Sequence, residues 1–533
     1  MRLALGAVKG LLPSLLRPGS DVERFPLEAR DLGAVVLWMY GKREYRASRF
    51  ASALGFYGRA LDREPDLAMA ALDAGQAASW LGQLADAERF VTVALEHQAG
   101  LPPPQLHYAR GLAAYLTGHA DSAVASLRLA LDVEGDWAEA HMALGEVFSH
   151  LLPASAFSLD SMAEAEFMAA SADTNFSPPL FHLAETAIRR GEVERGGELV
   201  RRYRAFVPEG PLVTLLDLML DCIRKGPASM DWEAAVRESA LEALAAAKSL
   251  AAAGAQPACA EGGYRAVMRD STAAPLHWGA VLGLQATLLA RGRREQYVRL
   301  VDSVIGYRPP TMTLYLLASV ADSGLAQKAI EAEAFIRRAF GEGYRNSPSH
   351  QLKWTMGVWH ALNGDQAVVS ALRDDLNAEA RNRQARLFAT GLTTLLSVLA
   401  GDLDSALTTL RRTGSTARRD SLEWQPGESL APERLLLARA LLEHGRYAEA
   451  IQVASVFDHS SAVVFPLYLA QSLAVRYRAA VALGQSRLAQ EYRARLISLG
   501  SVDLLSGGGS NQDKDADRSR HAGVVSSNLR RIK

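Results

Sequence analysis

Residues 50–65 read FASALGFYGRALDREP and contain the spacing that decides the fold. Ala53 and Ala60 are seven residues apart with Tyr57 between them, so the three side chains lie near one face of a helix. Small side chains let two antiparallel helices approach closely, and an aromatic ring one turn further on fills the space beside them. Pro65 ends the helix, because proline cannot continue a helix interior. The stretch therefore predicts one helix of a closely packed helical hairpin.

The same spacing recurs with a period near 34 residues. The steps are 34, 36 and 34 for a column of glycines, Gly41, Gly75, Gly111 and Gly145. Two columns of alanines repeat the first two steps, namely Ala53, Ala87 and Ala123, and Ala60, Ala94 and Ala130. The two extra residues fall at the proline-rich connection 101–104. A period of this length predicts stacked copies of one hairpin.

The later part of the chain keeps the hairpin signals but loses the strict period. Turns inside hairpins are expected at Gly191, Gly292, Gly364, Gly401, Gly445 and Gly484. The fourth hairpin is six residues longer than the third, with the addition around 152–157. Residues 271–290 form the longest uncharged run and predict a turn followed by a buried helix. After residue 500 the helical period stops, so a disordered tail is expected.

This register resembles the tetratricopeptide repeat (TPR), a family in which a small residue in the first helix faces the second helix. The resemblance implies an all-α, TPR-like α-solenoid superhelix of antiparallel helical hairpins. Four segments are expected: an N-terminal extension at 1–30, a TPR array of four regular units and a fifth at 31–209, a degenerate array at 210–500, and the tail at 501–533.

Three longer stretches resemble the TPR regions of bacterial serine/threonine kinases, adenylate cyclases and transcriptional activators. They are residues 47–82, residues 141–151 with 175–192, and residues 466–500. The resemblance implies a regulatory or protein-interaction role in bacterial signalling or transcriptional regulation. The chain departs from those proteins because residues 1–30 are too short to be a kinase, cyclase or DNA-binding module.

Charge and composition exclude several classes of function. The 533 residues carry a net charge of −1, so no global field attracts nucleic acid. No apolar stretch is long enough to predict a membrane span, although residues 1–16 could form a weak amphipathic surface helix. The two cysteines, Cys222 and Cys259, are too few for a disulfide framework. They lie in apolar helical sequence and are expected to be small core residues of a cytoplasmic protein.

No catalytic or cofactor motif accompanies the repeats, so an enzyme is not expected and no cofactor is predicted. The chain has no phosphate-binding loop, no His-Arg-Asp, no Gly-x-Ser-x-Gly and no His-Glu-x-x-His. Glu146 and His150 are four apart on one helical face. Together with His141, or with His182 and Glu185, they could in principle hold a metal, but a structural hydrogen bond is the preferred interpretation and no metal site is predicted.

The TPR resemblance implies that first helices line a concave groove. The glycine column sets the phase of those helices, and eleven residues are then expected to face a bound peptide or helix: Trp38, Lys42, Tyr45, Gln76, Ser79, Trp80, Tyr108, Tyr115, Glu146, Ser149 and His150. The alternative for each aromatic residue is that it fills the space between hairpins.

The preferred hypothesis is a scaffold or regulatory adaptor that binds a protein or peptide partner. A small-molecule-sensing regulatory module is the alternative, and it predicts a ligand-dependent thermal shift. An enzyme with an unrecognised site would need a deep pocket of converging titratable groups, and a nucleic-acid-binding solenoid would need a continuous basic stripe.

Overall fold

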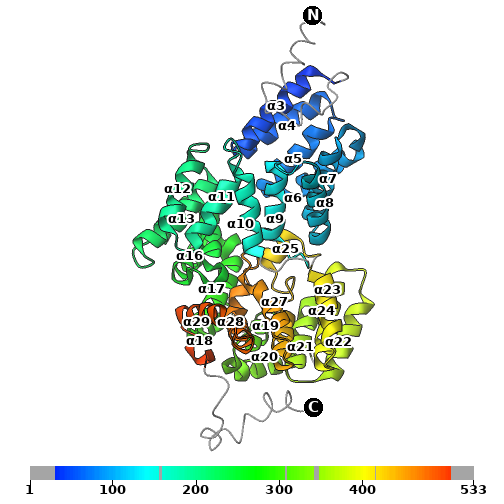
Figure 1. The fold of residues 1–533 in the computed structure, drawn as a ribbon. Coiled ribbons are helices and arrows are strands. Elements are labelled where there is room, and N and C mark those ends of the chain that lie inside the picture. The colour runs from blue at the N-terminus through cyan, green and yellow to red at the C-terminus, as the bar shows by residue number, and fades with distance from the viewer. Residues whose placement is uncertain are drawn as a thin grey trace, which may run out of the picture. The chain divides into compact units, whose positions relative to one another are not determined.

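The computed structural model describes residues 30–154, 159–305, 309–340, 347, 349–414 and 416–505. Within these ranges every regular element is a helix, and most helices pair with the next one in antiparallel hairpins (Figure 1). The predicted all-α, TPR-like solenoid is confirmed. Apart from Arg30 and residues 501–505, the predicted N-terminal extension and tail lie outside the described residues.

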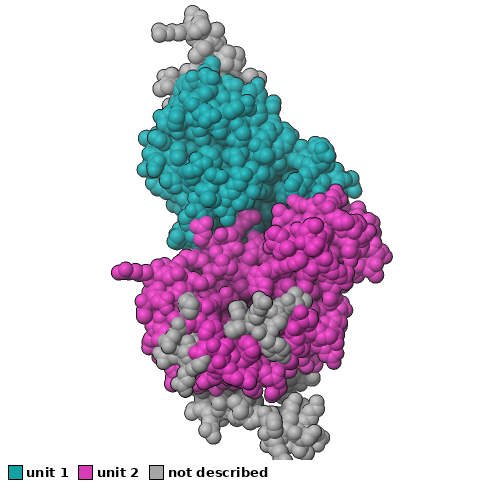
Figure 2. All heavy atoms as spheres, turned by 180° about the vertical axis from the view of Figure 1, so that it is seen from behind, with its two compact units in different colours: residues 1–155, 161–187, 194–217 teal, residues 156–160, 188–193, 218–533 magenta. Residues whose placement is uncertain are grey.

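The chain divides into two compact units, which Figure 2 colours separately. Unit 1 contains residues 1–155, 161–187 and 194–217, and unit 2 contains residues 156–160, 188–193 and 218–533. The boundary at 209 and 210 that the sequence suggests stays a prediction.

The hairpins of unit 1 follow one another without a break in their order. Their helices are α3 (Leu32–Arg46), α4 (Phe50–Arg63), α5 (Ala68–Trp80), α6 (Leu84–Glu96), α7 (Pro103–Leu116), α8 (Ala120–Val133), α9 (Ala138–His150), α10 (Leu159–Ala170), α11 (Pro178–Arg189) and α12 (Val193–Arg204). A short 3-10 turn, η2 (Gln98–Gly100), precedes α7, and α13 (Pro211–Lys225) begins in this unit.

The glycine column occupies the points where paired helices come closest. A Cβ atom added to Gly41, Gly75 or Gly111 would lie 2.3, 2.6 or 2.6 Å from a side chain sixteen residues later, in Tyr57, Val91 and Leu127 respectively. For Gly145 the corresponding contact is with Phe167, twenty-two residues later, at 2.4 Å. The predicted register is therefore confirmed, and the offset of six residues confirms the addition to the fourth hairpin.

The turns inside hairpins use the left-handed backbone region. Gly82 has φ +71° and Gly445 has φ +74°, conformations that glycine adopts without steric penalty. The other six predicted or equivalent turn glycines also have positive φ: Gly118, Gly191, Gly292, Gly364, Gly401 and Gly484. In the first hairpin Ser48 takes this conformation instead, with φ 56°.

Unit 2 contains the remaining helices. They are α14 (Trp232–Glu238), α15 (Ala240–Ala251), α16 (Pro257–Arg269), α17 (His277–Ala290), α18 (Arg294–Leu300), α19 (Pro309–Ala321), α20 (Ala326–Phe340), α21 (His350–Leu362), α22 (Gln366–Ala378), α23 (Arg383–Leu399), α24 (Leu403–Gly414), α25 (Arg419–Trp424), α26 (Ala431–Glu443), α27 (Tyr447–Ser455), α28 (Phe465–Ala482) and α29 (Ser486–Ser498). Short 3-10 segments are η3 (Ala252–Gly254), η4 (Ser271–Leu276), η6 (Ser323–Leu325), η8 (Val456–Asp458) and η9 (Val502–Leu505), and η5 (Val301–Ile305) is a short π-helix.

The end of the unit 2 array packs back on its beginning. Helix α28 contacts α17 and α19, and the Tyr468 hydroxyl donates a hydrogen bond to the carbonyl of Leu317 at 3.3 Å. This differs from a fully open trough, and the reason lies in α17. Residues 280–290 of that helix are all buried. A helix that is apolar on every side must be covered on every side.

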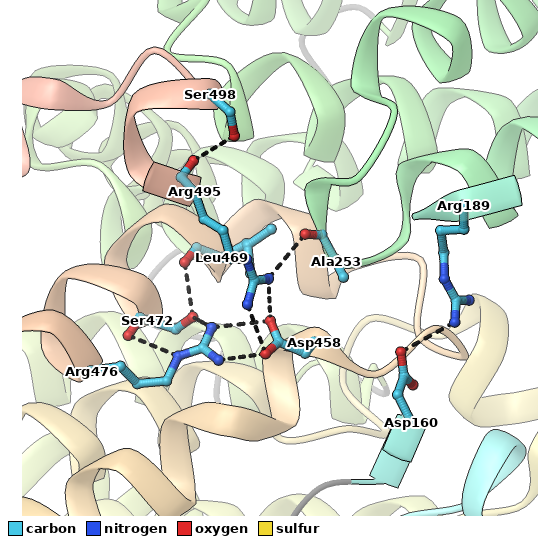
Figure 3. Close-up of polar contacts among 9 residues, drawn as sticks. All are labelled: Asp160, Arg189, Ala253, Asp458, Leu469, Ser472, Arg476, Arg495 and Ser498. Carbon is cyan, nitrogen blue, oxygen red and sulfur yellow. Dashed lines mark hydrogen bonds and ion pairs between the residues drawn. The ribbon is translucent and has the colours of Figure 1, made fainter. Parts of the chain in front are cut away.

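A cluster of charged side chains stabilises the same contact between the end of the unit 2 array and its beginning (Figure 3). The Asp458 carboxylate accepts hydrogen bonds from Arg476 of α28 at 2.5 Å and from Arg495 of α29 at 2.5 Å. Arg495 also donates to the carbonyl of Ala253 in η3, at 3.1 Å. Burial opposes ionisation of Asp458, but the two guanidinium groups hold its pKa well below the usual value. The Arg495 guanidinium thus links the last hairpin to η3, and the Asp458 carboxylate holds it there.

The two cysteines are core residues, as predicted, because Cys222 of α13 and Cys259 of α16 are both buried. They also form a disulfide with a Cα–Cα distance of 6.0 Å, which the sequence did not predict. The two residues are 37 positions apart, and only the packing of α13 near α16 brings the sulfur atoms together.

No helix within the described ranges combines the length and the apolar character that crossing a bilayer requires.

Candidate functional site

The eleven residues predicted for the groove all lie on first helices of unit 1, but most are covered. Six are no more than 6% exposed: Trp38, Tyr45, Gln76, Ser79, Tyr108 and Tyr115. The other five are half-buried: Lys42, Trp80, Glu146, Ser149 and His150. Binding of a partner through these residues stays a prediction, and the half-buried group is the part that a partner could reach in the folded chain.

The aromatic side chains fill the space between hairpins. Trp80 stacks on Phe50 with ring centroids 4.5 Å apart, and Tyr45 packs against Phe50 and Phe176. The indole nitrogen of Trp38 donates to the Asp73 carboxylate at 2.6 Å. Large rings and a satisfied indole stabilise the stack of hairpins by burying apolar area.

Ion pairs and a backbone hydrogen bond join the first hairpin of unit 1 to later helices of the same unit. Arg46, at the end of α3, forms ion pairs with Glu139 of α9 at 2.6 Å and with Asp173. The backbone N–H of Ser177 donates to the carbonyl of Arg46 at 2.8 Å. The first hairpin is thus joined to residues more than ninety positions later in the chain, which leaves little open groove between them.

A polar cluster lies where α9 meets α11. It contains Glu146, His150 and His182, called the Glu146 cluster below. His182 Nε2 lies 2.6 Å from Glu146 Oε1, and His150 Nε2 lies 3.2 Å from Glu146 Oε2. Glu185 adds a carboxylate 3.5 Å from His182 Nδ1. The structure therefore brings the sequence-predicted pair Glu146 and His150 together with His182.

The charges in the Glu146 cluster stabilise one another. Burial opposes ionisation of Glu146, but the imidazoles of His182 and His150 hold its pKa well below the usual value. Burial likewise disfavours the His182 imidazolium, yet the Glu146 carboxylate outweighs it and raises the pKa of His182 to about 9. Without another ligand, the cluster is a buried imidazolium–carboxylate pair.

His141, the other histidine considered from the sequence, lies elsewhere. Its Nδ1 atom is 2.6 Å from Glu166 Oε2, and its Nε2 atom is 3.0 Å from the carbonyl of Gly135. His141 therefore takes no part in the Glu146 cluster, although it lies on the same helix.

The Glu146 carboxylate also borders a small cavity. Tyr115 donates to Glu146 Oε2 at 3.3 Å, and both residues line a space of about 20 Å³ together with Gln76, Ser79 and Trp80. This volume holds about one water molecule. Five of the predicted groove residues, including Trp80, thus meet at one point, but the space is far too small for a peptide.

A larger pocket lies among the helices of unit 2, and the sequence did not indicate it. It has a volume of about 350 Å³. Helices α19, α20, α21, α26 and α28 and the turn η6 line it with Ser319, Val320, Ser323, Ala326, Trp359, Leu362, Arg439, Leu442, Glu443, Gln471, Ala474, Val475 and Arg478. We call it the α26–α28 pocket.

Two arginines define the charge of the α26–α28 pocket. Arg439 Nη2 donates to Gln471 Oε1 at 3.0 Å, and among the described residues its guanidinium forms no ion pair. Burial, with a smaller contribution from the nearby charge of Arg478 and against the opposing effect of Glu443, lowers the pKa of Arg439 to about 10. Arg439 is still charged at neutral pH, so this wall of the pocket is cationic.

Sequence reasoning missed this pocket because the glycine register was followed only through the first four hairpins. A usable signal was present in LLLARALLEHG, residues 435–445, where Arg439 and Glu443 interrupt an apolar stretch of the first helix before the turn glycine. Charged residues at such positions indicate an inner surface.

Comparison with known proteins finds only distant structural similarity. No protein-family profile matches the chain, and no curated protein matches it. Similar solved structures are TPR proteins. YrrB, whose structure is described as having an unusual peptide-binding site, shares 18% identity over 35% of this chain and 93% of its own, with a TM-score of 0.20. A chain of the APC/C hetero-tetramer Cut9–Hcn1 shares 14% identity over 91% of this chain and 98% of its own. Yeast Tom70 shares 13% identity over 86% of this chain and 99% of its own, and both structures have a TM-score of 0.23.

Proposed function

We propose that this chain is a non-catalytic interaction scaffold or regulatory adaptor, and that it holds an acidic segment of a protein partner in the α26–α28 pocket. The observation that carries the proposal is Arg439, a guanidinium that lines a pocket of about 350 Å³ without a carboxylate partner among the described residues.

The pocket wall combines apolar and cationic groups. Trp359 and Val475 supply buried apolar surface, while Arg439, Gln471 and Arg478 supply hydrogen-bond donors. Binding sites of this kind draw affinity from apolar contacts and orientation from a few polar groups. A short peptide stretch with one acidic and one apolar side chain matches both.

The charge of the pocket favours a carboxylate. A guanidinium binds a carboxylate through paired N–H donors, and the interaction strengthens where water is excluded. The nearby charge of Arg478 disfavours the charged form of Arg439, and a bound anion relieves that repulsion. Glu443 stands at the same pocket and disfavours a ligand with several negative charges.

The resemblance to bacterial signalling chains supports a regulatory setting for this interaction, with a cytoplasmic location as the sequence suggests. The Cys222–Cys259 disulfide bears on that location, because disulfides persist mainly in oxidising compartments. Recovery of the chain with both cysteines as free thiols from freshly lysed, alkylated cells supports the cytoplasm, and recovery of the disulfide counts against it. With a net charge of −1, nucleic acid is not an expected partner.

A small-molecule sensor is the second candidate, favoured by the same pocket volume. Cavities of about 300–1,000 Å³ are typical of small-ligand sites. A small organic acid could therefore occupy the pocket in place of a peptide, and it would raise the melting temperature of the chain by mass action.

The test compares partner capture by three forms of the full chain. The wild type, Arg439→Met and a control, Arg299→Met, are immobilised and incubated with lysate of the source cell. Arg299 is a suitable control because it belongs to unit 2, its side chain is 69% exposed and it lies outside the pocket. Captured proteins are identified by mass spectrometry, and their acidic segments are then synthesised and titrated.

We expect the wild type and Arg299→Met to capture the same partner, and Arg439→Met to lose it. A synthetic acidic segment should bind the wild type saturably, and amidation of its carboxylates should weaken binding. If Arg439→Met retains every partner, the pocket does not hold the partner. If no peptide binds but small carboxylic acids raise the melting temperature of the wild type alone, the chain is a small-molecule sensor.

A further inference from the structure

We propose that Glu146, His150 and His182 form a binding site in unit 1 for a divalent transition-metal ion of the Zn²⁺ type. The site is independent of the α26–α28 pocket, because it lies in the other unit and shares no residue with it.

The three side chains offer donors at the spacing that a metal needs. One ligand atom from each residue lies within 4.8 Å of the other two. A Zn²⁺ ion binds imidazole nitrogen and carboxylate oxygen at about 2.0–2.1 Å, so two donors in a tetrahedral site are about 3.3 Å apart. His150 Nε2 is 3.2 Å from Glu146 Oε2, and His182 Nε2 is 2.6 Å from Glu146 Oε1. The two distances reach different oxygens of Glu146, so the carboxylate lies between the two imidazoles, and a small shift of it would let one oxygen join both nitrogens around an ion.

The fold places the three donors firmly. Glu146 and His150 are one helical turn apart on α9, so both project from the same face. His182 comes from α11 and is 5% exposed. Its ring stacks on Phe167 with centroids 4.5 Å apart and an interplanar angle of 7°, and Trp80 packs beside it at 5.4 Å. Packing on both sides leaves the His182 imidazole little freedom to turn away.

A fourth residue orients one of the ligands. Glu185 Oε2 lies 3.5 Å from His182 Nδ1. A carboxylate on the outer nitrogen of a histidine sets the tautomer in which Nε2 is the acceptor, and it increases the basicity of that nitrogen. In this chain the outer carboxylate and the Nε2 atom that faces Glu146 are both in place.

The donor set selects the class of metal. Two imidazoles and one carboxylate suit Zn²⁺ and its first-row neighbours, whereas Mg²⁺ and Ca²⁺ prefer oxygen ligands throughout. Three protein ligands leave one position of a tetrahedral ion for water or for a donor from a partner. The small cavity that Glu146 borders holds about one water molecule.

The experiment titrates the full chain with Zn²⁺ alone, after treatment with a chelator and dialysis. Binding is followed by calorimetry, and bound zinc is counted by elemental analysis. Co²⁺ is added separately, because its visible absorption distinguishes tetrahedral from octahedral coordination. The variants are His150→Ala and Glu185→Gln, with His141→Ala as the control, and circular dichroism checks that each one folds.

His141 is the matched control because it lies on α9 and pairs with Glu166, outside the Glu146 cluster. We expect one Zn²⁺ per wild-type chain, tetrahedral Co²⁺ absorption, and the same results for His141→Ala. His150→Ala should lose that binding, and Glu185→Gln should weaken it by about 10- to 100-fold. Absence of saturable Zn²⁺ binding by the wild type, or full binding by a folded His150→Ala chain, would overturn the proposal.

Discussion

Replacing Gly41 by alanine tests the close helix approach on which the hairpin register depends. The new Cβ atom would lie 2.3 Å from Cε1 of Tyr57, and ordinary contact begins at 3.4 Å. Helix α3 or the Tyr57 ring must therefore move by about 1 Å. The ring is 1% exposed and packed on all sides, so it cannot swing into solvent.

Two opposing effects set the size of the change. Overpacking a close contact typically costs about 1–3 kcal/mol. Alanine in place of glycine in a helix interior returns about 1 kcal/mol of helix propensity. We therefore expect Gly41→Ala to destabilise unit 1 by about 1 kcal/mol, which lowers its melting temperature by about 2–4 °C for a unit of this size.

Gly55 provides the control within the same hairpin. It lies in helix α4, and a Cβ atom added there meets nothing within 4 Å. Gly55→Ala should therefore gain the propensity without the clash and raise the melting temperature by about 2–4 °C. The assay is thermal and urea unfolding of the full chain followed by circular dichroism.

The steric reasoning has a second check in a double variant. In a Tyr57→Leu background the ring is gone, so the added alanine at Gly41 should lose most of its penalty, and the two substitutions should be strongly non-additive. If Gly41→Ala stabilises the chain as much as Gly55→Ala does, or if the two substitutions are additive, the close approach of α3 and α4 is not what the glycine serves.

Three further predictions concern unit 2. Glu433 is fully buried and its pKa is raised to about 7 by burial, so between pH 4.5 and 7 the native state holds a proton that the unfolded state has released. The free energy of unfolding should therefore fall across that window by on the order of 3 kcal/mol. Glu433→Gln can still accept the hydrogen bond from Trp354 but cannot titrate, so it should abolish the fall between urea titrations at pH 5 and pH 7.5. Reduction of the Cys222–Cys259 disulfide, which closes a 37-residue separation, should cost about 4 kcal/mol, and equal melting temperatures with and without reductant would contradict this. Asp458→Asn should lower the free energy of unfolding by about 3 kcal/mol, because it leaves the buried Arg476 without its anionic partner. An unchanged urea midpoint would contradict the role of the Asp458 carboxylate in the contact between the end and the beginning of the array.

Local sequence spacing was sufficient to predict the hairpins of unit 1. Small residues at Gly41 and Ala53 mark the faces that meet, and the contact of Gly41 with Tyr57 follows from the phase alone. The six added residues in the fourth hairpin were also visible, since they shift the contact of Gly145 to Phe167. Such features depend on residues within one or two hairpins, where helical periodicity determines which side chains face each other.

The candidate sites depended on more distant residues. Glu146 and His150 were recognisable as a pair because they are one turn apart, but His182 meets them only through the packing of α11 against α9. Trp38 and Tyr45 were assigned to a groove, yet the curl of unit 1 buries both. A small change in the rotation between hairpins accumulates along a solenoid, and no local pattern specifies it.

The sequence by itself thus determined that the chain is a stack of helical hairpins, where the first of them begin, and which small residues let their helices nest. Only the tertiary structure decided that α28 returns to α17, that Cys222 meets Cys259, and that Arg439 lines a cationic pocket. The physical reason is range: helix pairing is set by side chains a few turns apart, whereas closure and pocket formation depend on the summed geometry of many hairpins.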